Sequence, residues 1–372
     1  MDIGTEAVKI LSFQAQKRDV EVLDGTVEYY RTFSNGRDNS QKEVLEETLA
    51  KALGNIQGKN GKPNNIFLGL PQDVLRERTV YGSFVRERSG SKISKTEEKL
   101  VYRKVLGEAA NEIGKMAAEN FGIMVQDFDF LSFRVFKIRI DGYDVPYLEG
   151  YKGKNLEFEI LSVFSPKDYI KEVKDTLKKL KLKVIKIIPE IEALLSFFKK
   201  TNAVFIDIGG RSTRIFVIWE DRPEQLHEIA TGESVFVEAI AKILGLKLDD
   251  AASLQEDYSK GALSEGAANK LKEIFAPYLE EWFGLVKDKF SEQGKLLPSD
   301  VFIFGGGSLL PDFRKAMEEH SWDNTIFIKD PIIKVLRPQD LIQNKGQSAL
   351  IRLNSPQYSL SLLMANYAQK DF

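Results

Sequence analysis

Two short motifs in this sequence combine a carboxylate with a glycine turn. The first runs Asp2-Ile3-Gly4-Thr5, and the second, far along the chain, runs Asp207-Ile208-Gly209-Gly210. Glycine lets backbone N–H groups approach phosphate oxygens, a hydroxyl adds a donor, and a carboxylate can hold Mg²⁺ through water. Two such turns facing each other would clamp a triphosphate. Asp2 and Asp207 are therefore the candidate magnesium-binding carboxylates.

Either motif alone is more typical of an ordinary turn after a strand, so it is the pair that favours phosphate binding. The second motif is followed by two hydroxyl residues that could add donors. The residues predicted to hold the phosphates are Gly4, Thr5, Gly209, Gly210, Ser212, Thr213 and Gly232.

A third element is a glycine run that follows an apolar stretch. Residues 301–304 are Val-Phe-Ile-Phe, and Gly305, Gly306, Gly307 and Ser308 come directly after them. Because glycine has no side chain, this backbone could lie against an adenine or a ribose. The alternative interpretation is a flexible loop between a strand and a helix that starts near Pro311.

The composition excludes several kinds of chemistry. The chain has 372 residues, no cysteine and two histidines, so disulfides and thiolate sites are impossible, and histidine-based zinc sites or Ser/His/Asp triads are disfavoured. A formal charge of −2 gives no overall field that would attract nucleic acid. No apolar stretch approaches the roughly 20 residues of a membrane-spanning helix. We expect a cytoplasmic protein.

The hydrophobic pattern predicts a mixed α/β chain. Capping boxes at Ser40–Glu43 and Ser94–Glu97 predict helix starts, and Pro166 predicts a third helix with Pro at its first position. Further helices are expected over 190–198 and from 234 to 290. The predicted strands are 8–13, 20–23, 66–70, 130–140, 156–160, 184–188, 202–207, 214–219 and 301–304.

Lysine and arginine concentrate in two stretches. Over 86–99 the basic residues alternate with glutamates and no aromatic residue lies between them, which favours a solvated face over a nucleic-acid site. A denser lysine cluster over 171–186 raises the alternative of an anionic partner or a lipid surface.

The order and spacing of the three glycine-containing elements resemble the actin-like ATPases. The resemblance implies an α/β, actin-like two-lobed (ribonuclease H-like duplicated) fold that holds ATP and Mg²⁺ in its cleft. A small α+β insert in the first lobe narrows the resemblance to the branch of FtsA and PilM, where an SHS2-type subdomain occupies that place. The segment 141–157 is similar to the FtsA pattern before the chain returns to the first lobe.

The resemblance implies five consecutive segments. They are 1–70 (first lobe), 71–160 (insert), 161–200 (first lobe), 201–335 (second lobe, with a helical part over about 233–295) and 336–372 (closing segment of the first lobe).

Residues 191–195 (Ile-Glu-Ala-Leu-Leu) resemble the acidic segment of PilM that precedes the second phosphate strand. Actin-like enzymes orient the attacking water in this region. Glu192 is therefore the candidate for positioning water for attack on the γ-phosphate. The alternative is an ordinary glutamate on a helix surface.

Three features depart from the family pattern. Arg211 stands where a small residue is usual, and it either pairs with phosphate or crowds the turn. Ala252 and Gln255 replace a Glu and a Lys near the ribose. Asp2 directly follows Met1, so the apolar strand before this Asp is absent and neighbouring backbone groups need other partners.

The resemblance implies a scaffold with slow ATP hydrolysis at most. We expect self-association into filaments, an FtsZ-like tail as partner in cell division, and attachment to the inner face of the membrane only indirectly or through an anchor not seen here. One alternative is a pilus scaffold of the PilM type that grips a peptide of a membrane partner beside the insert. Others are a metabolite kinase of the same fold and a pseudo-enzyme without nucleotide.

Overall fold

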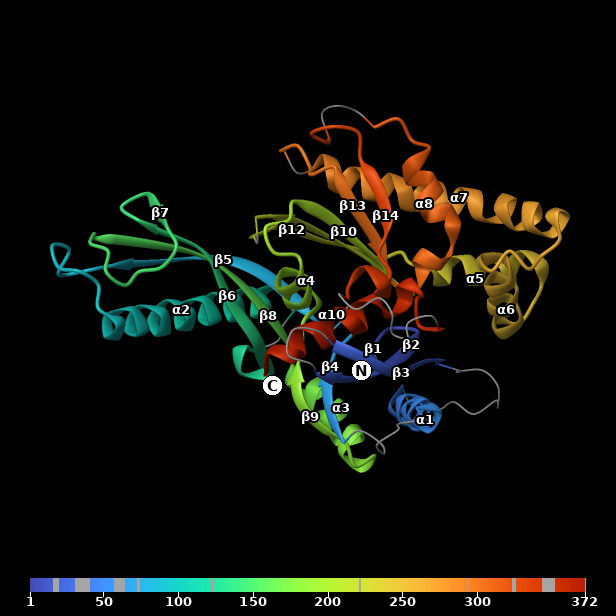
Figure 1. Ribbon diagram of the computed structural model, residues 1–372, viewed down its shortest axis with the longest axis horizontal. Coiled ribbons are helices and arrows are strands. Elements are labelled where there is room, and N and C mark those ends of the chain that lie inside the picture. The colour runs from blue at the N-terminus through green and yellow to red at the C-terminus, as the bar shows by residue number, and fades with distance from the viewer. Residues whose placement is uncertain are drawn as a thin grey trace. The chain divides into compact units, whose positions relative to one another are not determined.

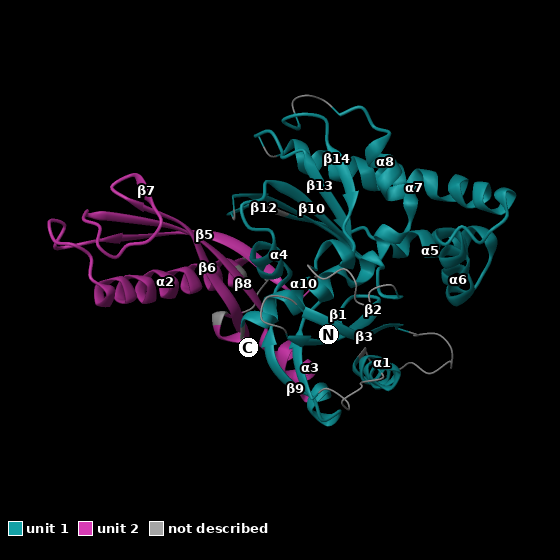
Figure 2. Cartoon of the chain, viewed as in Figure 1, with its two compact units in different colours: residues 1–72, 176–372 teal, residues 73–175 magenta. Residues whose placement is uncertain are grey.

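The computed structural model describes residues 1–15, 20–30, 41–56, 64–71, 74–121, 124–220, 222–292, 294–322, 326–342 and 352–371. The chain divides into two compact units. Unit 1 consists of Met1–Gln72 and Thr176–Phe372, and unit 2 of Asp73–Asp175 (Figure 2).

The first lobe of unit 1 is built on two small sheets. Its strands are β1 (Asp2–Ile3), β2 (Ala7–Ala15), β3 (Val20–Tyr29), β4 (Asn65–Leu68) and β9 (Lys183–Ile187). β1, β2 and β3 form an antiparallel meander, whereas β4 and β9 pair in parallel (Figure 1). A parallel bridge between Asp2 and Gly69 joins them, and the Met1 nitrogen donates to the Phe67 carbonyl. The backbone groups beside the short β1 thus find partners in the chain around β4.

Three helices accompany these sheets: α1 (Gln41–Asn55), α4 (Glu190–Phe197) and α10 (Ser359–Ala368). A further helix, α3 (Lys167–Lys179), contains the boundary between the two units, and its residues up to Asp175 belong to unit 2. The predicted capping residue of α1, Ser40, lies outside the described residues. α10 packs against α4 and β2, so the end of the chain returns to the first lobe. The prediction for α3 was wrong by one residue, because Pro166 ends a strand and the helix begins at Lys167.

The second lobe has one five-stranded sheet in the order β12-β11-β10-β13-β14. Its strands are β10 (Ala203–Ile208), β11 (Thr213–Trp219), β12 (Arg222–Ile229), β13 (Asp300–Phe304) and β14 (Ile332–Val335). β10 is central and buried along its whole length, which explains its continuous apolar sequence. β12 and β14 were not predicted. Both are edge strands, where polar residues and Pro223 are tolerated.

The helices of the second lobe are α5 (Ser234–Leu244), α6 (Leu248–Ser259), α7 (Glu265–Ser291) and α8 (Pro311–Glu318). The apolar side chains of α7 form part of the core, with Trp282 and Phe275 buried. The rings of Phe236 and Phe313 lie edge-on to them. In the described part of the chain, no helix is both long and apolar enough to cross a membrane.

Unit 2 is a four-stranded antiparallel sheet with α2 (Lys95–Phe121) on one face. Its strand order is β5-β8-β6-β7, with β5 (Arg76–Val85), β6 (Phe128–Ile140), β7 (Tyr143–Val145) and β8 (Asn155–Pro166). A Cβ atom at Gly82 would lie 2.4 Å from Val105 of α2, so glycine permits the close packing of helix on β5. This glycine and three charges hid β5 from the sequence pattern.

Short 3₁₀ segments complete the described structure. They are η1 (Val125–Asp127), η2 (Gly307–Leu309), η3 (Pro338–Asp340), η4 (Pro356–Tyr358) and η5 (Gln369–Asp371).

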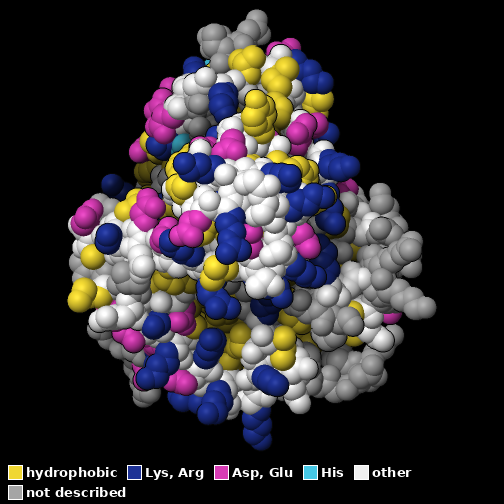
Figure 3. Space-filling model, turned by 90° about the vertical axis from the view of Figure 1, so that its left-hand side faces the viewer, with side chains coloured by type: hydrophobic (Ala, Val, Ile, Leu, Met, Phe, Trp, Pro, Cys, Tyr) yellow, Lys and Arg dark blue, Asp and Glu magenta, His cyan; other side chains and the backbone are white. Residues whose placement is uncertain are grey.

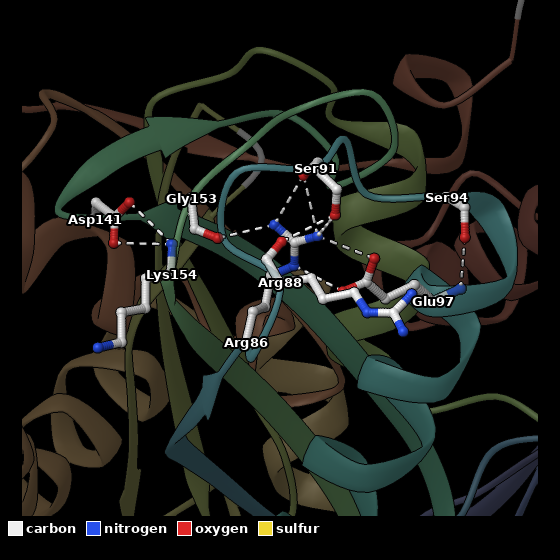
Figure 4. A network of polar contacts seen from close by, with 8 residues as sticks. All are labelled: Arg86, Arg88, Ser91, Ser94, Glu97, Asp141, Gly153 and Lys154. Carbon is white, nitrogen blue, oxygen red and sulfur yellow. Dashed lines mark hydrogen bonds and ion pairs between the residues drawn. The ribbon is translucent and has the colours of Figure 1, made fainter.

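A buried arginine ties the loops at one end of unit 2 together (Figure 4). Arg86 donates to both carboxylate oxygens of Glu97, at 2.7 and 3.0 Å, and to the carbonyls of Gly153 and Ser91. The predicted capping box is half formed: the Ser94 hydroxyl accepts from the Glu97 N–H, but the Glu97 side chain turns to Arg86. The hydrogen bond from Arg86 lowers the pKa of Glu97.

We expect Arg86→Met to destabilise unit 2 by about 3 kcal/mol, because it removes one partner of a buried pair and leaves two carbonyls without a donor. Urea unfolding measures this loss. Arg88→Met, at an exposed neighbour, is the control and should change the free energy of unfolding by less than about 0.5 kcal/mol. Equal effects of the two substitutions would contradict a structural role for Arg86.

Candidate functional site

A cleft in unit 1 is lined from both of its lobes. The first lobe contributes the β1–β2 turn with Asp2, the residues after β4, and the start of α4. The second lobe contributes the turn after β10 with Asp207, the start of α5 and Gly306. α10 adds apolar side chains, among them Met364. The two motifs singled out in the sequence therefore open into one space.

Both motifs are turns of antiparallel hairpins. In the first, Asp2 lies opposite Lys9, and the Gly4 N–H donates to the Ala7 carbonyl at 2.9 Å. In the second, the Gly209 N–H donates to the Ser212 carbonyl at 2.9 Å. Each aspartate thus stands two residues before the first glycine of its turn.

The two hairpins touch each other directly. A Cβ atom at Gly210 would lie 2.1 Å from Cγ of Glu6, so the turn of the second hairpin needs glycine here. The Arg211 Nε atom donates to Glu6 Oε1 at 2.6 Å. The Arg211 side chain is 66% exposed, so this ion pair contributes at most about 1 kcal/mol. The Arg211 guanidinium thus binds a carboxylate across the cleft, a contact that the sequence did not predict. Its pairing with phosphate stays a prediction.

Lys9 carries the positive charge inside the cleft. Its Nζ atom lies 3.2 Å from Asp2 Oδ2. Burial lowers the pKa of Lys9, but the carboxylates of Asp2, Asp207 and Glu190 more than offset this, so that the pKa is raised overall. Among the described lining residues Lys9 is the single cation. The acidic ones are Asp2, Glu6, Glu190, Asp207 and Glu233.

The start of α4 brings a different glutamate to the cleft from the one predicted. Glu190 lines the cleft and lies 3.3 Å from Nη1 of Arg214, a buried ion pair between α4 and β11. Glu192 is also buried in α4, but it is not among the described residues that line the cleft. Of these two glutamates, Glu190 is therefore the one whose carboxylate can reach a ligand in the cleft.

The glycine run after β13 packs against the second hairpin. A Cβ atom at Gly305 would lie 2.1 Å from Asp207 Oδ1, and one at Gly307 would lie 2.4 Å from Ile208. Gly305 also has a φ of +90°, which favours glycine. Of the run, Gly306 lines the cleft. The Ser308 hydroxyl donates to the Gly305 carbonyl at 2.7 Å and so closes the turn itself.

The second hairpin is fixed to the start of α5. The N–H groups of Glu233 and Ser234 donate to the carbonyls of Gly209 and Gly210, at 2.9 and 2.8 Å. A Cβ atom at Gly232 would lie 2.5 Å from the Gly209 carbonyl, which explains a glycine at this position. The first donors of the helix are therefore used by the turn.

The hydroxyl of Thr213 serves the core. It donates to the Thr231 carbonyl at 2.8 Å and accepts from the Trp282 indole at 3.0 Å. Thr213 is fully buried and Ser212 is nearly so, and neither is among the residues lining the cleft.

Glu233 is an unusual carboxylate in this cleft. Its Oε1 atom accepts from the Gln255 amide at 2.6 Å, so the Gln255 noted in the sequence reaches the site through this glutamate. Burial raises the pKa of Glu233 to about 7, against a smaller opposing effect of Gln255 and Lys9. Glu233 is therefore partly protonated near neutral pH.

The predicted site residues fall into two groups. Those lining the cleft are Asp2, Gly4, Thr5, Asp207, Gly209, Gly210 and Gly306. Those that are not among its lining residues are Glu192, Ser212, Thr213, Gly232, Gly305, Gly307 and Ser308. Sequence reasoning missed Lys9, Glu190 and Glu233. Lys9 had a usable signal, because a tight hairpin after Asp2 places a charged residue of an apolar strand opposite it.

The side chains that line the cleft suit a Mg²⁺ ion that arrives bound to phosphates better than a metal ion held by protein ligands alone. Within the described ranges, no group of three or more His, Asp or Glu side chains is arranged to hold a metal ion. Mg²⁺ commonly keeps several waters and binds through one or two carboxylates plus phosphate oxygens. Asp2 and Asp207 fit that role, and the glycine turns leave backbone close to the same space.

Comparison with known proteins gives a structural match only. No family model matches the sequence, and no curated protein matches it. The solved structure of a PilM–PilN type IV pilus biogenesis complex is similar over 99% of this chain and 97% of its own, with a TM-score of 0.70 and 14% sequence identity. That likeness extends over both lobes and the insert. The chain has an actin-like fold.

Other structural similarities to the actin-like chain are weaker. Component A of (R)-2-hydroxyglutaryl-CoA dehydratase from Acidaminococcus fermentans covers 100% of this chain and 96% of its own at 13% identity, with a TM-score of 0.41. MreB 5 of Spiroplasma citri bound to AMPPNP covers 55% and 66% at 14% identity, with a TM-score of 0.35. Both are too distant to bear on function.

The raised pKa of Glu233 predicts a pH-dependent stability. Its pKa is about 7 in the folded chain and near 4.5 when exposed, so its stabilising contribution is complete below about pH 4.5 and is lost as the pH rises through 7. We expect Glu233→Gln to be more stable than the parent at about pH 8, by on the order of 2 kcal/mol, and nearly equal at about pH 5. Urea unfolding at both pH values measures this.

Glu238→Gln provides the control, since Glu238 is exposed on the same helix. Its free energy of unfolding should follow that of the parent at both pH values. If Glu233→Gln also follows the parent, Glu233 does not titrate with a raised pKa.

Proposed function

We propose that this chain is an actin-like scaffold that binds Mg–ATP between the Asp2 and Asp207 hairpins and engages a peptide of a membrane-linked assembly. The observation that carries the proposal is the convergence of the two glycine hairpins on one cleft with Lys9 between them. Glycine backbone and an ammonium group are the elements that recognise phosphate.

The charge of the cleft favours a nucleotide with its metal over a bare anion. Five carboxylates and one lysine line the described cleft, so a triphosphate alone would meet net repulsion. Mg²⁺ would offset that repulsion and neutralise charge on the phosphates. Asp2 and Asp207 would hold its water ligands, and Lys9 would exchange part of its contact with Asp2 for phosphate oxygen.

Turnover is proposed to be slow. Glu190 reaches the cleft but is already paired with Arg214, and this pairing restrains the position of its carboxylate. Glu192, the earlier candidate for positioning water, would have to act from behind the lining. Nucleotide state, rather than rapid hydrolysis, would then control self-association into filaments.

The pilus-type partner is preferred to the cell-division one. The PilM–PilN structure matches nearly the whole of this chain, insert included, which supports a PilM-like scaffold that grips a segment of a PilN-type protein. An FtsA-like role with an FtsZ-type tail remains the second candidate, because it requires the same fold and the same cleft. Either role places the chain beside the inner face of a membrane.

Nucleotide binding predicts a thermal shift. Mg–ATP at about 100 times its Kd should stabilise the chain by about 2.7 kcal/mol, and Asp207→Asn should lose most of that shift because it removes one carboxylate facing the metal's water ligands. Differential scanning fluorimetry with and without Mg²⁺ measures both. Asp249→Asn, at an exposed aspartate on α6, should shift as the parent does. No shift at millimolar Mg–ATP would leave a nucleotide-free scaffold.

Partner choice predicts a difference between two peptides. We expect a fluorescent peptide from a PilN-type membrane protein to bind with micromolar affinity and an FtsZ C-terminal tail not to bind, as measured by fluorescence anisotropy. A scrambled PilN-type peptide is the control. Binding of the FtsZ tail alone would favour the cell-division role, and binding of neither peptide would refute peptide recruitment.

A further inference from the structure

Two loops of unit 2, residues 86–95 and 147–154, are joined by backbone hydrogen bonds. Ile93 exchanges two of them, with the Tyr151 carbonyl at 2.8 Å and the Gly150 N–H at 2.9 Å. The Arg86 N–H donates to the Lys154 carbonyl at 2.8 Å, at the far end of the pair. We call these segments the paired loops. They present a single continuous surface.

Buried charge holds the paired loops in place. The Arg86 guanidinium binds Glu97 and the Gly153 carbonyl beneath them (Figure 4). The Asp141 carboxylate accepts the N–H groups of Lys154 and Asn155. These hydrogen bonds lower the pKa of Asp141. Burying a guanidinium is unfavourable unless its donors are used, and the donors of Arg86 are used by Glu97 and by carbonyls of both loops.

Outward, the paired loops carry basic and aromatic side chains. Tyr147 and Tyr151 are 54% and 37% exposed and form an edge-to-face pair with ring centroids 5.6 Å apart. Five exposed basic residues accompany two exposed acidic ones, an excess of three positive charges on a chain whose formal charge is −2. The basic residues are Arg88, Lys92, Lys95, Lys152 and Lys154, and the acidic ones are Glu87 and Glu149.

In the sequence, the basic residues and the tyrosines of this surface lie in different segments. The basic stretch over 86–99 contains no aromatic residue, which favoured a plain solvated face. The fold brings Tyr147 and Tyr151 to it from a different segment. Figure 3, in which the left-hand side of Figure 1 faces the viewer, shows lysine and arginine side chains spread among apolar ones, with tyrosine counted among the apolar.

We propose that the paired loops form a docking surface for an anionic phospholipid bilayer. Tyrosine rings suit the headgroup region, because one end is apolar and the other is wet. Lysine and arginine side chains near an anionic leaflet are attracted to its negative surface potential. The inference is independent of nucleotide binding, since every residue used lies in unit 2.

A bilayer fits this surface better than an acidic protein or a nucleic acid does. The basic residues are exposed, long and unpatterned, and mobile headgroups adapt to such a set, whereas a folded partner requires fixed complementary positions. The two rings pack against each other edge-to-face, which leaves less ring surface for stacking on bases. An excess of three charges gives weak, reversible binding, which would add to attachment through a membrane-linked partner.

The test is co-sedimentation of the full chain with vesicles of equal parts phosphatidylglycerol and phosphatidylcholine, compared with phosphatidylcholine alone. We expect binding to the anionic vesicles only, weakening as salt rises because the charges are screened. Lys92→Glu with Lys152→Glu should reduce the bound fraction at least five-fold. Tyr147→Ser with Tyr151→Ser should reduce it less and leave the salt dependence intact.

The matched control is Lys270→Glu with Lys272→Glu, two exposed lysines of α7 in unit 1. This variant carries the same change of charge and should bind as the parent does. An equal loss in both double variants would show general charge attraction and overturn the paired loops as the site. Failure of the parent to bind anionic vesicles would overturn the proposal outright. Unchanged thermal midpoints of the variants exclude unfolding as the cause.

Discussion

The ammonium group of Lys9 is the charge on which the cleft depends. It is held against Asp2 by hairpin register and lies close enough to Asp207 and Glu190 for their carboxylates to keep it protonated despite burial. Without it, several carboxylates from two lobes would face each other across a narrow space. Lys9 has more acidic neighbours than one positive charge can neutralise, so the cleft favours a further cation. This is the electrostatic reason to expect Mg²⁺ with a nucleotide.

Steric constraint adds to this electrostatic one. The turn at Gly210 rests on Glu6 of the opposite hairpin, and Gly305 rests on the Asp207 carboxylate. Both contacts are closer than any side chain allows. The glycines of these motifs therefore do two things: they expose backbone toward the cleft, and they let three separate segments of the chain approach one another around Asp207.

Sequence reasoning succeeded where a local pattern had a single structural meaning. The central strand β10 and the two glycine turns were predicted, because burial on both sides of a strand and turn chemistry each leave a direct mark in the sequence. Edge strands β12 and β14 left none, since polar residues are tolerated there. Glu190 and Glu233 were missed because their importance comes from burial beside other chain segments, which no local pattern records.

Hydroxyl residues show the limit most clearly. Thr213 stands two residues from a glycine turn, and its type suggests a phosphate donor. In the structure, the Thr213 hydroxyl instead donates to the Thr231 carbonyl and accepts from Trp282, inside the core. Residue type and spacing predicted correctly which hairpin contributes to the site. They could not predict the direction of the Thr213 side chain, because it depends on Trp282 of the distant helix α7.

The hydrogen bonds from Glu233 and Ser234 to Gly209 and Gly210 have a mechanical consequence. They attach the turn beside the cleft to the first residues of helix α5. At the opposite end of that helix the chain exposes Ile243, Leu244 and Leu246. A rotation of the turn would therefore act on the first residues of the helix, and the apolar surface lies three helical turns further along the same helix.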